Sequence, residues 1–90
     1  MNRKDVFNKI LKHFDGDLSG TEILLAEGFD DAFIGLGQQF DTTVAIYDRN
    51  KCIEILIKQN MTDEEAIVFF EYNVTGAYMG KNTPVFVELF

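Results

Sequence analysis

Aspartates in the first half of the chain have the side-chain chemistry that a divalent metal site requires. Asp30 and Asp31 are adjacent, and Asp41 and Asp48 follow them. Metal-assisted phosphoryl chemistry would use such carboxylates together with a base and a cationic clamp. The spacing shows no ligand pattern, and this part of the chain has no Lys or Arg. A metal-dependent enzyme using Asp30, Asp31 and Asp48 is therefore one alternative, and a loop aspartate pair with a helix cap is the simpler interpretation.

A second acidic motif, Asp15-x-Asp17-x-Ser19-Gly20, is similar to the front of a calcium-binding EF-hand loop. That loop requires a bidentate Glu at its twelfth position. Here the twelfth position is Ala26, and the residues that follow the motif favour a strand over a helix. We therefore expect a turn stabilised by an aspartate side chain at this point.

Polar and aromatic side chains around the expected third helix could instead hold a small ligand. Asn73 falls beside Ala66 on the apolar stripe of that helix, so we expect it to be partly buried and in need of hydrogen-bond partners. Most such amides bond to a neighbouring loop or strand. The alternative is a nucleotide or metabolite site around a pocket or an oligomer seam, formed by Asn73, Tyr47, Tyr72 and Tyr78.

The same helix has a second apolar ridge, formed by Val68, Tyr72 and Met79, on a side that is not the core stripe. A helix that is apolar on nearly all sides is either enclosed in its domain or exposed at an interface. Full enclosure is difficult in a small domain. The ridge therefore predicts a surface for a protein partner or for self-association.

The elements that position these residues follow from periodicity and from turn residues. Helices are expected over 2–14, 49–60 and 63–79, and strands over 21–27, 32–37, 42–48 and 85–89. On the last strand, Val85, Val87 and Leu89 share a face. Helices and strands do not alternate strictly, so the 90 residues are expected to form a single α+β domain with three helices packed on a small three- or four-stranded sheet.

Two of the helix starts have clear capping signals. Asp48 can cap the second helix, and Thr62 with Glu65 forms a capping box for the third. Gly80 is expected to end the third helix. Cys52 lies on the apolar face of the second helix and has no second cysteine to pair with, so we expect a reduced, buried thiol.

Charge and hydropathy exclude several classes of function. The net charge is −7, with basic residues concentrated at the start and acidic ones through the middle, which disfavours direct nucleic-acid binding. No apolar run approaches the length of a membrane-spanning helix, and the first residues form a charged amphipathic helix and not a signal peptide. We therefore expect a cytoplasmic protein.

Three segments in a fixed order, GFDDAFIGLG, VAIYDRNKCIEIL and MTDEEAIVFFEYNVTGAYMGKNTPVF, resemble a family of small uncharacterised proteins encoded by tailed bacteriophages. The resemblance covers about residues 21–86. It implies a phage gene product acting in the cytoplasm of the infected bacterium or carried in a virion. It implies no activity, so it transfers no functional residue.

The expected function is that of a non-enzymatic interaction protein that modulates a host or phage protein and needs no cofactor. The sequence lacks a catalytic constellation and has a spare apolar ridge, which favours this interpretation. Small-ligand binding and a divalent-metal-dependent enzyme are the two alternatives.

Overall fold

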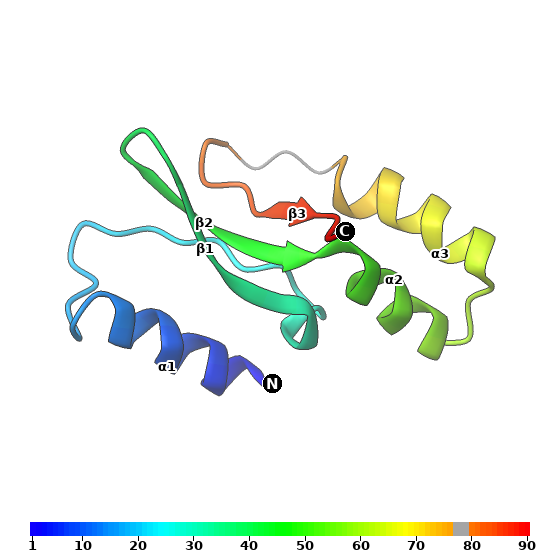
Figure 1. Cartoon of the computed structure of the whole chain (residues 1–90), viewed down its shortest axis with the longest axis horizontal. Coiled ribbons are helices and arrows are strands. Elements are labelled where there is room, and N and C mark those ends of the chain that lie inside the picture. Colours follow the sequence, from blue (N-terminus) through cyan, green and yellow to red (C-terminus); the bar gives the residue numbers. More distant parts are fainter. Residues whose placement is uncertain (77–79) are drawn as a thin grey trace.

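The computed structural model describes residues 1–76 and 80–90. These residues form three α-helices and a three-stranded sheet, so the expected α+β class is confirmed and the sheet has three strands (Figure 1). The elements in chain order are α1 (Arg3–His13), β1 (Phe33–Gln39), β2 (Thr42–Asp48), α2 (Arg49–Lys58), α3 (Asp63–Phe69) and β3 (Val85–Val87). A 3-10 turn, Asp30–Ala32, precedes β1, and a π-helical turn, Phe70–Val74, continues α3.

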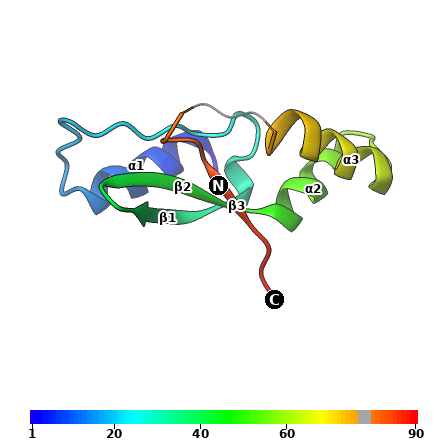
Figure 2. The ribbon, with the colours of Figure 1, turned by 90° about the horizontal axis from the view of Figure 1, so that it is seen from above.

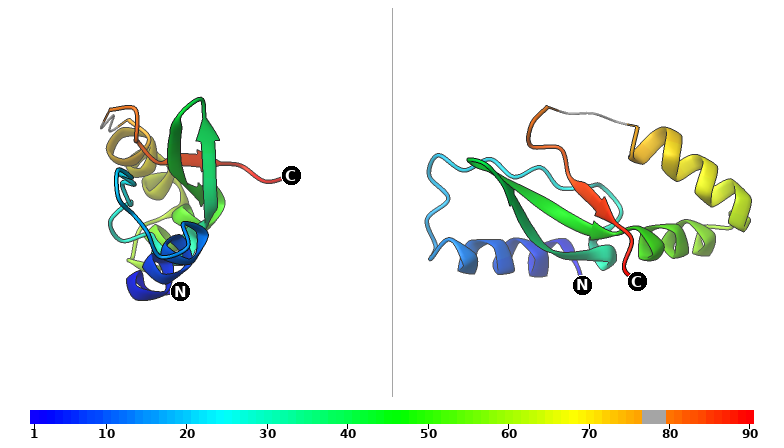
Figure 3. Two further views of the ribbon diagram at one scale, coloured as in Figure 1. Left: turned by 90° about the vertical axis from the view of Figure 1, so that its left-hand side faces the viewer. Right: turned by 45° about the horizontal axis from the view of Figure 1, so that its top comes forward.

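The sheet lies at the centre of the molecule. Helix α1 runs beside β1 at one end of the sheet, and α2 and α3 lie side by side at the other end (Figure 1). Viewed from above, α1 and the connection that follows it lie on one side of the sheet, and the C-terminal tail projects from the other side (Figure 2). The left panel of Figure 3 shows the same arrangement end-on. In the described part of the chain, α1 and the connection after it lie on one side of the sheet, and α2 and α3 lie at its end.

The sheet has the order β1-β2-β3. β1 and β2 form an antiparallel hairpin, with a register shift between Phe33 and Gly35, and β3 pairs with β2 in parallel. The register places Phe33 opposite Tyr47 and Tyr47 opposite Phe86. These three rings are in contact within the core. The core-facing residue of β3 is therefore Phe86, whereas Val85 and Leu89 are exposed.

The predicted caps are confirmed. The Asp48 carboxylate accepts from the backbone N–H groups of Asn50 and Lys51, so β2 passes into α2 without a loop. The Thr62 hydroxyl accepts from the Glu65 N–H, and the Glu65 carboxylate accepts from the Thr62 N–H. Both helices therefore begin at the residues that the sequence indicates.

The prediction of a strand over 21–27 is wrong. This segment is extended but pairs with no strand among residues 1–76 and 80–90, and it runs along the same side of the sheet as α1. Three other groups hold its backbone. The Ala26 N–H donates to the Tyr47 hydroxyl at 2.9 Å, the Arg3 guanidinium donates to the Ala26 carbonyl, and the Asn82 amide donates to the Glu22 carbonyl. Side-chain contacts therefore replace the expected strand ladder.

The third helix differs from the prediction in its length and winding. The α-helix ends at Phe69 and the π-helical turn ends at Val74, so the predicted helix over 63–79 is too long. The Thr75 N–H donates to the Phe70 carbonyl, a bond that spans five residues. Ala66 and Phe70 are buried, whereas Ile67, within the regular α-helical part, is 39% exposed.

Candidate functional site

The three aspartates proposed for a metal site have separate structural roles. Asp30 accepts from the Arg3 guanidinium at 3.1 Å, and Asp31 pairs with the N-terminal ammonium group. Asp48 caps α2. Within residues 1–76 and 80–90, no group of three or more His, Cys, Asp or Glu side chains is placed to hold a metal ion. The described geometry thus gives no support to the metal-dependent alternative.

The EF-hand-like motif forms the expected turn. The Asp17 carboxylate accepts from the Ser19 backbone N–H at 2.9 Å, and hydrogen bonding by the Ser19 side chain and then by its backbone lowers the pKa of the carboxyl group. Such a bond is typical of a turn stabilised by an aspartate side chain.

The residues proposed for a small-ligand site are not brought together. Tyr47 is fully buried in the core, where its ring lies between Phe33 and Phe86. Its hydroxyl is occupied by the Ala26 N–H, and burial raises its pKa. Its assignment as a ligand residue is therefore wrong on structural grounds, because no surface of Tyr47 is open to a ligand.

Asn73 is exposed, which contradicts its expected burial. The π-helical turn rotates it away from Ala66, because each residue of a wider helix advances through a smaller angle. Asn73 lies instead at the border of two surface hollows along α3. Tyr78, the third proposed ligand residue, lies outside the described residues.

The proposed partner surface is exposed. Val68 is 55% exposed and Tyr72 is 78% exposed, whereas Met79 lies outside the described residues. Phe69 and Ile67, both 39% exposed, extend the apolar area. We call Val68, Phe69 and Tyr72 the α3 ridge. It is the part of the predicted site that the structure places at the surface.

Acidic side chains surround the α3 ridge. Glu64 and Glu65 line a shallow hollow with Val68, Phe69 and Asn73. The Thr62 backbone N–H holds the pKa of the Glu65 carboxyl below its usual value. On the next turn, Glu71 pairs with Arg49 at 3.3 Å. The ridge is therefore apolar at its centre and negative at its border.

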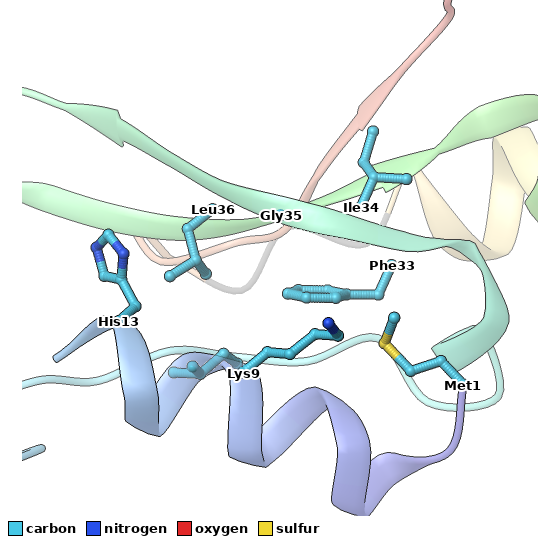
Figure 4. A pocket seen from close by; sticks show the side chains of 8 residues that line it. Met1, Lys9, His13, Phe33, Ile34, Gly35 and Leu36 are labelled. Carbon is cyan, nitrogen blue, oxygen red and sulfur yellow. The ribbon is translucent and has the colours of Figure 1, made fainter. Parts of the chain in front are cut away.

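A further hollow, which the sequence does not predict, lies between α1 and β1. It has a volume of about 320 Å³ (Figure 4). It is lined by Met1, Lys9, Ile10, His13, Phe33, Ile34, Gly35 and Leu36. The sequence contains only a weak indication of this hollow. Lys9 and His13 are four residues apart and therefore share one side of the helix.

Comparison of the chain with protein-family models, with curated proteins and with solved structures finds no match. An assignment of function therefore rests on the residues of this chain and their geometry. No helix in the described part of the chain is long and apolar enough to cross a membrane.

Proposed function

We propose that this chain is a non-enzymatic interaction protein that binds a partner protein through the α3 ridge. The observation that carries the proposal is the exposure of Val68 and Tyr72 on one side of α3 and its π-helical extension. Tyrosine is a frequent centre of binding energy at protein interfaces, because it buries a large rigid area and retains a polar group.

The charges around the ridge indicate the chemistry of the partner. Glu64, Glu65 and Glu71 border the ridge, and the only described ion pair among them is that of Glu71 with Arg49. A basic segment with apolar side chains would complement both the centre and the border of this surface. An amphipathic helix or loop with Lys or Arg beside its apolar residues fits this description.

The cellular setting of the proposal comes from the sequence. The order of motifs over residues 21–86 resembles that of small tailed-phage proteins, which supports a host or phage protein as the partner and the infected bacterial cytoplasm as the location. Self-association through the same ridge is the competing form of this proposal.

The test compares three forms of the chain as bait in lysate from infected cells, with mass spectrometry of the retained proteins. We expect the wild type to retain a partner that the Val68→Ser/Tyr72→Ser double variant loses. The matched control is Phe7→Ser, which removes an apolar side chain of similar exposure from α1. Binding of the purified partner by calorimetry should fall about tenfold or more in the double variant.

Two results would contradict the proposal. One is equal retention of the partner by the double variant and the control. The other is a wild-type chain that is monomeric by light scattering and retains no protein. A dimer that the double variant abolishes would identify a second copy of the chain as the partner.

A further inference from the structure

The outer edge of β1 has no partner strand. β1 pairs with β2 along one edge, and within residues 1–76 and 80–90 no other strand pairs with it, while α1 runs beside its outer side (Figure 1). Its seven residues, FIGLGQQ, contain neither a charge nor a proline. Natural proteins normally protect such edges with charged residues, with proline or with a covering segment, because free backbone donors and acceptors attract another strand. This edge has the properties of a binding site for an extended chain.

The α1–β1 hollow lies beside this free edge. Phe33 and Leu36 point from β1 toward α1, whereas Ile34 points to the opposite side of the strand (Figure 4). Gly35 lies between Ile34 and Leu36 and has no side chain. Its backbone is open to close approach, since an added Cβ there would meet no atom within 4 Å. A strand added at the edge would thus place alternate side chains in the hollow.

The lining of the hollow has a charge opposite to that of the whole chain. The net charge is −7, yet the lining contains two basic side chains, Lys9 and His13, and no carboxylate. Lys9 extends along α1 beneath the Phe33 ring, and His13 stands near Leu36 (Figure 4). A local positive site in an acidic protein favours a ligand that carries a negative group close to an apolar one.

We infer that the α1–β1 hollow binds an extended acidic peptide segment of a partner protein, which adds a strand to the free edge of β1. The peptide backbone pairs with Phe33–Leu36, one apolar side chain contacts Phe33 and Leu36, and a Glu or Asp side chain meets Lys9 and His13. Main-chain pairing gives affinity in this mode of recognition, and the pockets for alternate side chains give specificity. The site is separate from the α3 ridge and does not depend on it.

Fluorescence anisotropy with labelled peptides tests this inference on the full chain. The probe is a short peptide of alternating valine and threonine with two glutamates, and its matched control has lysines in place of the glutamates. We expect the acidic peptide to bind about tenfold tighter than the lysine peptide. Lys9→Glu should weaken binding of the acidic peptide by a similar factor. Lys4→Glu, an equal change of charge at an exposed position of α1 that does not line the hollow, should change it less than about twofold.

Amide hydrogen exchange followed by NMR separates strand addition from general charge attraction. Binding of the acidic peptide should slow exchange at amides within residues 33–37, and N-methylation of alternate peptide groups should abolish binding. The inference is overturned if the acidic peptide fails to bind at millimolar concentration, if Lys4→Glu weakens it as much as Lys9→Glu, or if protection appears outside β1. Protection of the β1 edge in a dimer without any peptide would also overturn it, because a second copy would then occupy the edge.

Discussion

Replacing Tyr47 with Phe removes one oxygen atom from the centre of the core. The Tyr47 hydroxyl accepts the Ala26 N–H at 2.9 Å, and both residues are buried. Phe at position 47 keeps the ring contacts with Phe33 and Phe86, whose centroids lie 5.7 and 5.5 Å from that of Tyr47. The variant therefore isolates the hydrogen bond that anchors segment 21–27.

The magnitude follows from the group that is left behind. An unsatisfied buried N–H costs about 1–3 kcal/mol, and removal of the partly desolvated hydroxyl recovers some of this, so we expect a loss of about 1–2 kcal/mol in the free energy of unfolding. For a domain of this size, each kcal/mol lowers the melting temperature by about 4–8 °C. The expected decrease is therefore about 5–15 °C.

Urea denaturation followed by circular dichroism measures the free energy, and hydrogen exchange at Ala26 reports the local effect. Tyr72→Phe is the matched control, because Tyr72 is largely exposed and its hydroxyl should contribute less than about 0.5 kcal/mol. If Tyr47→Phe is as stable as the control and Ala26 exchanges no faster, then side-chain anchoring of segment 21–27 is refuted.

Three further predictions concern the thiol, a helix cap and an ion pair. Burial raises the pKa of Cys52 from 9.0 to about 12, so the stability it contributes is present below pH 9 and is lost as the pH rises toward 12; between these values the wild type should lose up to about 1.4 kcal/mol per pH unit more than Cys52→Ala in denaturant titrations. Thr62→Ala should lower the free energy of unfolding by about 0.5–2 kcal/mol, whereas Thr62→Ser should keep most of the wild-type stability because serine retains the capping hydroxyl. An equal loss of stability in both variants would contradict the capping role. Arg3→Gln breaks the pairs with Asp30 and Glu27 and should cost at most about 1 kcal/mol at low salt; the difference from wild type should shrink in molar NaCl, and a salt-independent difference would point to packing instead.

Local signals were sufficient to predict the helix starts. Asp48 and Thr62 cap their helices through bonds to backbone N–H groups within the next three residues, so the sequence contains both partners. Helix α1 meets the core along a narrow line: Val6 and Ile10 are buried, whereas Phe7 is 48% exposed.

Non-local pairing was not predictable for segment 21–27. An extended segment on a core shows a similar alternation of apolar residues whether or not a strand pairs with it. Here the backbone of the segment bonds to distant side chains instead, among them the Tyr47 hydroxyl, which lies 21 residues from Ala26 in the chain. The sequence contains no signal for that distant contact.

The exposure of Val68 and Tyr72 agrees with their predicted position off the core stripe of the third helix. The predicted burial of Asn73 is wrong, because an angle of 100° per residue does not hold through a π-helical turn. The α1–β1 hollow was missed because it forms between elements whose relative positions depend on the whole fold.

The parallel pairing of β2 with β3 has a consequence for the order of folding. The β1–β2 hairpin joins near neighbours in the chain. In contrast, Ile46 pairs with Val85, and the residues of α2 and α3 lie between them in the sequence. Closing the longer loop costs more entropy before any contact compensates for it, so non-local strand pairs form slowly. We expect the hairpin and the α2–α3 pair to form first and β3 to join last. Phe86 contacts both Tyr47 and Phe70. Its packing against these two rings would then be the last step in the formation of the core.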